Sequence, residues 1–187
     1  MFILFLGAPG SGKGTQGQIL SRRLGSPKIA TGDILRAAMK AGTALGREAK
    51  RFYDVGKLVP DTLILELIKT ELAKPEAQQG AIFDGFPRTA TQAELVDKTL
   101  ALRGQRLTHV LLLDVPEEEL VRRLHGRALQ EGRIDDTPET IRTRLVVYQQ
   151  ETAPLVAHYA QRGIVHRVPG LGTVDTIAEE IKRIIGR

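Results

Sequence analysis

Short apolar runs alternate with amphipathic stretches along the whole chain, and the apolar runs predict buried β-strands. The predicted strands cover residues 2–6, 81–83, 110–115 and 164–168, with a weaker candidate at 28–30. The stretches between them have helical periodicity, at 13–24, 61–73, 89–102, 117–125, 138–162 and 173–185. Strands that alternate with helices of these lengths predict an α/β fold, in which helices cover both faces of a parallel sheet.

The helical pattern at 138–162 has a clear start signal. Thr137 can cap the helix, and Pro138 can occupy its first position. A stripe of four residues then follows at spacings of three and four, which defines one helix face: Ile141, Leu145, Tyr148 and Thr152. We therefore expect a helical stretch over 138–162.

Two segments interrupt the alternation of strands and helices. Residues 31–59 are compatible with helix but contain no strand pattern, and glycines break them into short pieces. Residues 126–137 are polar, rich in charge and begin at Gly126. Excursions of this kind commonly carry substrate clamps or lids. We expect Asp135 and Asp136, within the second segment, to form salt bridges with arginines of the lid or to act as a hinge, rather than to bind a metal.

The composition excludes several classes of function. The chain of 187 residues has no Cys, which rules out a disulfide framework, a thiolate zinc site and a cysteine nucleophile. The net charge is +5, but Lys and Arg are dispersed and aromatic residues make up only 4%, so neither nucleic acid nor a membrane is an expected partner. The apolar run at 2–6 is too short for a membrane span or a signal peptide, and we expect a cytoplasmic protein.

A glycine-rich loop follows the first predicted strand. Residues 7–15 read Gly-Ala-Pro-Gly-Ser-Gly-Lys-Gly-Thr, the Gly-x-x-x-x-Gly-Lys pattern between a strand and a helix. Glycines let such a loop turn its amide groups towards an anion, and the following helix adds its positive end. Lys13 would bridge the outer phosphates of a nucleotide. Gly14 stands where the pattern usually has Ser or Thr, so Thr15 becomes the candidate ligand for Mg²⁺.

Further motifs extend this pattern over nearly the whole chain. Residues 31–36 read Thr-Gly-Asp-Ile-Leu-Arg, and residues 83–88 read Phe-Asp-Gly-Phe-Pro-Arg. The second half contains a series of arginines at matching positions, namely Arg123, Arg127, Arg133 and Arg144. Together with the loop at 7–15, these motifs resemble the nucleoside monophosphate kinases, most closely the adenylate kinase family in its short-lid form.

The resemblance implies a P-loop NTPase-type α/β fold with a five-stranded parallel sheet, in a single kinase domain. A core (1–29, 60–125 and 138–187) would carry an NMP-binding insertion at 30–59 and a short lid at 126–137. It also implies reversible, Mg²⁺-dependent transfer of the ATP γ-phosphoryl group to AMP, giving two ADP. We expect a monomer, because the chain is small and two of its segments would have to move. A structural zinc ion is not expected, because the lid has no Cys.

The same resemblance implies roles residue by residue. The ATP site would contain Gly10, Ser11, Gly12, Lys13, Gly14, Thr15, Arg123, Arg127 and Gly172. The AMP site would contain Thr31, Arg36, Lys57, Leu58, Val59, Gly85, Phe86, Pro87, Arg88, Gln92, Arg133 and Arg144. Catalysis would depend on Lys13, Arg88, Arg127, Arg133 and Arg144. Asp84 would hold Mg²⁺ through water, with Thr15 as a second metal ligand.

Two alternatives remain open at this point. A UMP/CMP kinase of the same family would share the loop, the 83–88 turn and a short lid. Thr31 and Gln92 favour adenine, because a hydroxyl and an amide can meet the amino and ring-nitrogen edge of that base. A P-loop nucleotide switch would bind one nucleotide and would need neither a second pocket nor an arginine clamp.

Overall fold

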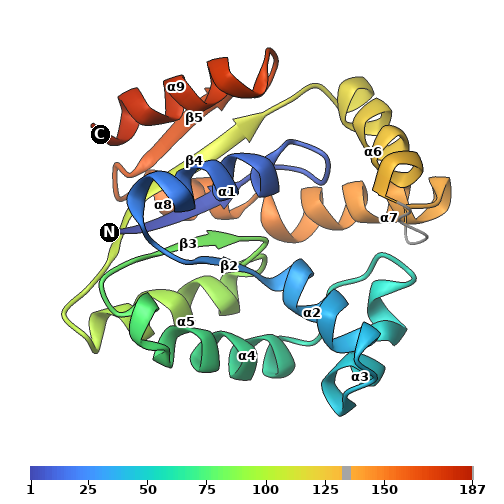
Figure 1. Ribbon diagram of the computed structural model, residues 1–187, viewed down its shortest axis with the longest axis horizontal. Coiled ribbons are helices and arrows are strands. Elements are labelled where there is room, and N and C mark those ends of the chain that lie inside the picture. The colour runs from blue at the N-terminus through green and yellow to red at the C-terminus, as the bar shows by residue number, and fades with distance from the viewer. Residues whose placement is uncertain (132–135, 187) are drawn as a thin grey trace.

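The computed structural model describes residues 1–131 and 136–186, and a five-stranded parallel sheet runs through its centre (Figure 1). The strands are β1 (Phe2–Leu6), β2 (Lys28–Ala30), β3 (Ala81–Asp84), β4 (Leu107–Asp114) and β5 (Val165–Pro169). They lie side by side in the order β2-β3-β1-β4-β5. Leu4 of the central strand pairs with Phe83 on one side and with Val110 on the other. The predicted parallel α/β fold is confirmed.

Helices cover both faces of this sheet. The helices α1 (Lys13–Leu24) and α9 (Val174–Ile185) pack on the face to which Ile3 and Phe5 point. The helices α4 (Asp61–Ala73), α5 (Ala90–Ala101) and α8 (Leu155–Ala160) cover the face of Leu4. Because both faces are covered, every residue of β1 is buried, which explains its continuous apolar sequence. Within the described ranges, no helix combines the length and the apolar character needed to cross a membrane.

Two helices form the excursion between β2 and α4. They are α2 (Thr31–Lys40) and α3 (Ala44–Tyr53), in agreement with the short helical pieces expected there. The Thr43 side chain caps α3 by accepting a hydrogen bond from the amide of Gly46. The helices cross closely at Gly46, where an added Cβ would lie 2.2 Å from the carbonyl oxygen of Ala38. A short 3₁₀ helix, η1 (Pro75–Ala77), follows α4.

The second half of the chain differs from its predicted elements by more than one residue in three places. The strand β4 begins at Leu107, three residues before the expected start at 110. The helix α6 (Glu117–Glu131) continues beyond the expected end at 125. The stretch 138–162 is not one continuous helix: it divides into α7 (Pro138–Val147), a π-helical turn η2 (Tyr148–Thr152) and α8. Pro154 lies between η2 and α8, and a regular helix cannot continue through it, because proline has no amide hydrogen to donate and its ring would collide with the preceding turn.

Candidate active site

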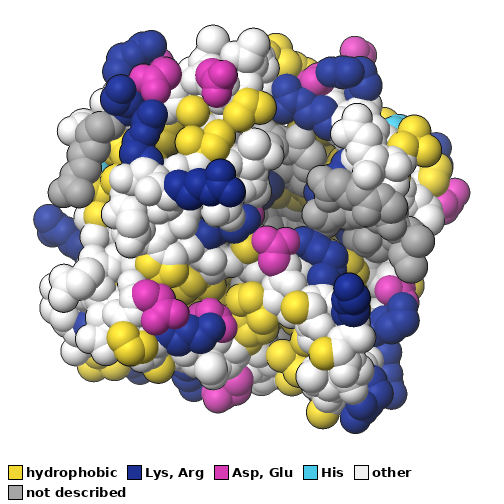
Figure 2. Space-filling view, in the orientation of Figure 1, with side chains coloured by type: hydrophobic (Ala, Val, Ile, Leu, Met, Phe, Trp, Pro, Cys, Tyr) yellow, Lys and Arg dark blue, Asp and Glu magenta, His cyan; other side chains and the backbone are white. Residues whose placement is uncertain are grey.

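A cleft of about 1170 Å³ opens at the carboxyl ends of β1 and β3. Its walls come from the loop after β1, the insertion helices, α6 and α7. Figure 2 shows this face of the molecule hollowed to the right of its centre, with Lys and Arg side chains scattered around the hollow. Ligands of open parallel sheets bind at this edge, where loops and helix N-termini converge. The cleft is therefore the candidate active site.

The glycine-rich loop predicted at 7–15 joins β1 to α1 and lines the cleft. Gly10 and Gly12 have φ values of 85° and 97°, in the left-handed region that glycine adopts without strain. Gly12 is the N-cap residue of α1, and no side chain of the described residues caps this helix end. The first amide groups and the positive end of α1 are thus available to an anion.

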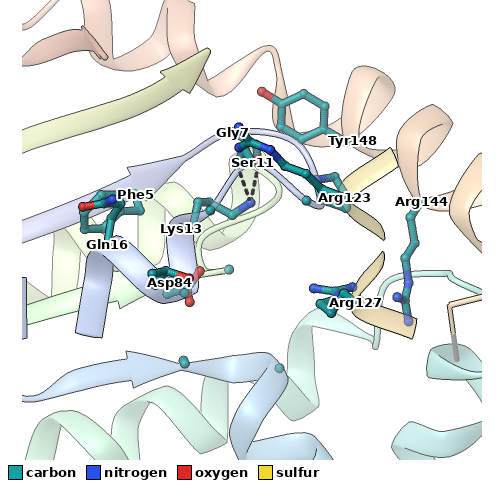
Figure 3. A pocket seen from close by; sticks show the side chains of 18 of the residues that line it. Phe5, Gly7, Ser11, Lys13, Gln16, Asp84, Arg123, Arg127, Arg144 and Tyr148 are labelled. Atoms are coloured by element: carbon teal, nitrogen blue, oxygen red, sulfur yellow. Dashed lines mark hydrogen bonds between the residues drawn. The ribbon is translucent and has the colours of Figure 1, made fainter. Parts of the chain in front are cut away.

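Lys13 begins α1, and its side chain folds back over the loop (Figure 3). Its Nζ donates hydrogen bonds to the carbonyl oxygens of Gly7 and Ala8, at 2.7 and 2.8 Å. Burial lowers the pKa of Lys13 to about 8, although the nearby Asp84 carboxylate opposes this shift. A bound phosphate would favour the charged form of Lys13 again, because it brings an opposite charge into the same buried place.

Asp84 ends β3 and lies close to Lys13 in the cleft (Figure 3). A Cβ added to Gly14 would lie 3.5 Å from Oδ2 of Asp84, which places the carboxylate against the first turn of α1. Mg²⁺ prefers such oxygen ligands and commonly combines a carboxylate with phosphate oxygens and water. Thr15 is exposed on the same turn. Over the described ranges, no group of three or more His, Cys, Asp or Glu could hold a metal ion. Asp84 therefore fits a magnesium ion that arrives with a nucleotide.

Arg123 spans the cleft wall between α6 and the loop after β5. Its Nε donates to the Glu119 carboxylate at 2.6 Å, and its Nη2 donates to the carbonyl oxygen of Gly170 at 2.9 Å. Hydrogen bonds from Arg122 and Arg123 lower the pKa of Glu119 to about 2, so this carboxylate is ionised at neutral pH. The guanidinium group of Arg123 is thus held in place, and both Arg123 and Gly172 line the cleft.

Arg127 and Arg144 meet at one buried carboxylate. Nε and Nη2 of Arg127 donate to the two oxygens of Asp136 at 2.8 and 2.9 Å, and Nη1 of Arg144 donates at 2.5 Å. The Asp136 side chain is 0% exposed. Both arginines line the cleft, and Figure 3 shows their side chains to the right of Lys13, with Arg144 farther from it than Arg127. The expected salt bridge to nearby arginines is confirmed for Asp136, whereas Asp135 lies outside the described residues.

A second pair of arginines lies on the side of the insertion. Nε of Arg88 donates to the carbonyl oxygen of Gly85 at 2.7 Å, and burial lowers the pKa of this guanidinium. Arg36 donates to the Tyr53 hydroxyl and to the Asp33 carboxylate. Burial disfavours the charged form of Arg36, but the interactions with Tyr53 and Asp33 outweigh this effect and raise the pKa of Arg36. Both guanidinium groups face the same cleft.

A small pocket of about 40 Å³ shares lining residues with the cleft. Gln92 is oriented there by two hydrogen bonds: its Oε1 accepts from the Arg88 amide at 2.8 Å, and its Nε2 donates to Asp61 at 2.6 Å. The Thr31 hydroxyl donates to the Gly85 carbonyl oxygen at 2.8 Å. Apolar side chains complete the lining, which thus combines an apolar surface with a few fixed polar groups, as small-molecule sites do. They belong to Leu35, Leu58, Val59 and Ile64.

The structure brings nearly all predicted site residues together. Within the described ranges, every predicted site residue lines the cleft or the small pocket except Phe86. The Phe86 side chain is 0% exposed and packs in the core near Phe83, with ring centroids 6.4 Å apart. The predicted role of Arg133 falls outside the described residues. The sequence analysis missed Tyr53 and Asp61, which no local motif marks, because their partners lie in other helices.

The loop, the parallel sheet and the two groups of arginines around one cleft define a P-loop kinase of small nucleotides. Comparison with known proteins identifies the group. The chain belongs to the adenylate kinase family, whose family model matches residues 5–164. It is 52% identical to an adenylate kinase of Thermus thermophilus over 184 residues, which is 98% of this chain and 96% of the relative. It is 49% identical to that of Kocuria rhizophila over 99% of this chain and 98% of the relative. It is 46% identical to that of Leptospira biflexa over 98% of both chains.

Proposed function

We propose that this chain catalyses the reversible transfer of the γ-phosphoryl group of ATP to AMP, which gives two ADP. The observation that carries the proposal is that two anion-binding groups face one cleft. The loop with Lys13 forms one of them, and Arg36 with Arg88 forms the other. A nucleotide switch needs only the first group, so the second group favours a phosphotransferase.

The donor nucleotide would occupy the loop side of the cleft. The backbone amides of residues 10–15 would bind its phosphates, since the first turn of α1 directs its positive end there. Arg123, held by Glu119 and Gly170, would lie against the base, near Gly172. Arg127 would bind the phosphates from α6.

The acceptor nucleotide would occupy the insertion side. Arg36 and Arg88 would bind its phosphate, because planar guanidinium groups can each contact two oxygens. Its base would enter the small pocket, where the amide of Gln92 and the hydroxyl of Thr31 are already oriented. Lys57, Leu58, Val59, Gly85 and Pro87 would complete this site around the nucleotide.

Positive charge is the main requirement of the transfer step. Phosphoryl transfer depends on positioning and on neutralising the negative charge of the phosphates, with little covalent chemistry by the protein. The transferring group would be surrounded by Lys13, Arg88, Arg127 and Arg144. Arg133 is predicted to act together with them. The acceptor is a phosphate oxygen with a second pKa of about 6, which is already ionised at neutral pH, so no general base is needed.

Mg²⁺ is the metal that fits the donor set in this cleft. When bound, it would neutralise charge on the donor phosphates and orient them. Asp84 would hold its hydration shell from the end of β3, and the Thr15 hydroxyl would approach from the first turn of α1. Neither role requires a change in the backbone of β3 or α1.

The division into a core, an insertion at 30–59 and a lid at 126–137 is part of the same proposal. Water competes with AMP for the phosphoryl group, so a site that closes over both substrates protects ATP from hydrolysis. Arg127 lies within the proposed lid and Arg144 lies in the helix that follows it, so closure would bring both arginines against the phosphates. A cytoplasmic monomer is a further prediction.

The deciding experiment measures ADP formation by the purified chain with ATP, AMP and Mg²⁺. We expect rapid ADP formation that requires AMP and disappears in Lys13→Met. CMP, UMP and GMP serve as alternative acceptors in the same assay, and we expect AMP to be strongly preferred. Absence of AMP-dependent ADP formation would refute the proposed activity, and comparable turnover with CMP would refute the choice of base.

A further inference from the structure

Tyr53 is the last residue of α3, and its half-buried side chain lies between two arginines of the cleft. Arg36 comes from α2 in the insertion, whereas Arg144 comes from α7, in the second half of the chain. Tyr53 also lines both the cleft and the small pocket. It therefore touches the parts of the protein that would have to converge on the acceptor nucleotide.

The hydroxyl group of Tyr53 holds Arg36. It accepts a hydrogen bond from Nη1 of Arg36, while Nη2 of the same guanidinium donates to Asp33. A guanidinium has five N–H donors, and these two bonds use one on each terminal nitrogen. The other three N–H donors are outside these two bonds and can donate to a phosphate. The Tyr53 hydroxyl thus fixes the direction of the Arg36 guanidinium and uses only one of its five N–H donors.

The ring of Tyr53 faces both guanidinium groups. The guanidinium carbon of Arg144 lies 5.2 Å from the ring centroid, and that of Arg36 lies 5.9 Å from it. Both distances are within the range of cation–π attraction. Two positive groups that repel each other are thus both attracted to one neutral ring, which offsets part of the cost of gathering them before a phosphate is present.

We propose that Tyr53 is a positioning residue for the acceptor phosphate, which fixes Arg36 through its hydroxyl and Arg144 through its ring. This inference rests on the proposed function and refines its acceptor site. The two contacts have separable consequences. The hydroxyl acts on Arg36 alone, which would bind the AMP phosphate. The ring acts on both arginines, and Arg144, the nearer one, would also contact the transferring group. Loss of the hydroxyl should weaken AMP binding, and loss of the ring should also slow the transfer.

Two substitutions separate the contributions of the hydroxyl and the ring. Tyr53→Phe removes the hydroxyl and keeps the ring, and we expect the KM for AMP to rise about three- to tenfold with kcat nearly unchanged. Tyr53→Leu removes both, and we expect a similar rise in KM together with a fall in kcat of about fivefold. The KM for ATP should stay within about twofold in both variants, because the loop with Lys13 is untouched.

Tyr159→Phe is the matched control. Tyr159 also has an arginine over its ring, with Arg162 at 5.5 Å, but it is buried in the core and lines neither the cleft nor the small pocket among the described residues. Its hydroxyl has no hydrogen-bond partner in the described part of the chain. Tyr159→Phe removes the same hydroxyl group as Tyr53→Phe, but outside the cleft, so we expect the KM and kcat values to stay unchanged.

A double-mutant cycle adds a test that a merely structural role would not pass. The effects of Tyr53→Phe and Arg36→Lys on the Kd for AMP, measured by calorimetry without ATP, should be clearly non-additive, because each substitution breaks the same contact. Additive effects would overturn the proposal. So would a lower KM for AMP in Tyr53→Phe, which would mean that the hydroxyl competes with the phosphate, or an equal rise in both KM values. The wild-type assay is run first, so that failure of the proposed activity is distinguished from failure of this inference.

Discussion

The Asp136 carboxylate binds the guanidinium fork of Arg127 through two hydrogen bonds while its side chain is fully shielded from solvent. Arg144 contributes a third hydrogen bond to the same group. Two of the arginines on which catalysis would depend by the family resemblance are therefore gathered at one buried anion. Two guanidinium groups beside each other would repel, and the carboxylate between them compensates that repulsion.

Asp136→Asn should destabilise the protein markedly. The substitution keeps the shape of the side chain but removes the negative charge that two partly buried arginines share, so we expect the free energy of unfolding to fall by about 3 kcal/mol in urea denaturation. Asp54→Asn is the control, because Asp54 pairs with Lys50 on the surface, where such a pair contributes less than about 1 kcal/mol. Equal losses in the two variants would contradict a special role for the buried carboxylate.

ATP binding should weaken above about pH 8. Burial lowers the pKa of Lys13 from 10.5 to about 8, whereas a bound triphosphate favours the charged form. Below pH 8 the lysine is already charged and the Kd for ATP should be flat; above it, binding must take up a proton, and the Kd should rise towards tenfold per pH unit. The Kd is measured by calorimetry from pH 7 to 9.5.

The control for this pH dependence is Lys13→Met, in which the rise in Kd above pH 8 should be absent. The stability of the empty protein should change in the opposite direction. Between pH 8 and 10.5 the unfolded chain binds a proton on Lys13 that the folded chain has lost, so this lysine makes stability increase with pH there. A Kd for ATP that stays constant up to pH 9.5 would show that Lys13 keeps its ordinary pKa.

Gly85→Ala should impair the acceptor site. Gly85 has a φ of 71°, and an added Cβ would lie 2.8 Å from Nη2 of Arg88 and 3.3 Å from the Thr31 hydroxyl. We expect a loss of unfolding free energy of about 1–2 kcal/mol from the backbone and a KM for AMP at least about tenfold higher from the displaced arginine. Gly104→Ala is the control: its φ is 65°, but nothing among the described residues lies within 4 Å of the added Cβ. It should lose comparable stability and retain its KM, and a raised KM there would refute the steric explanation.

Asp61→Ala should weaken the recognition of AMP. Asp61 lies at the start of α4 and accepts hydrogen bonds from the Gln92 amide at 2.6 Å and the Thr89 hydroxyl at 3.1 Å. Without it, the Gln92 side chain loses one of its two anchors, and we expect the KM for AMP to rise about three- to tenfold while the KM for ATP is unchanged. Asp61→Asn can still accept from Gln92 and should restore most of the affinity. If Asp61→Asn is as impaired as Asp61→Ala, the charge of Asp61 and not its hydrogen bond is what matters.

The sequence determined those features of this protein that depend on neighbouring residues. Apolar runs predicted all five strands because a strand covered on both faces must be apolar throughout, as β1 is. The loop at 7–15 was recognisable because the backbone geometry of a phosphate cradle requires glycine at set positions, and Gly10 and Gly12 indeed have positive φ values. The motif residues of the cleft followed from the same local patterns and the family resemblance.

Only the tertiary structure decided which side chains orient those motif residues. The contacts of Asp61 with Gln92 and of Tyr53 with Arg144 join helices that are far apart in the sequence, so no local pattern encodes them. The tertiary structure also decided the role of Phe86. Its position inside the 83–88 motif predicts a site residue, but its side chain is buried in the core. Periodicity indicates which face of a helix is buried. The partner that a polar side chain meets depends instead on how the helices pack around the sheet.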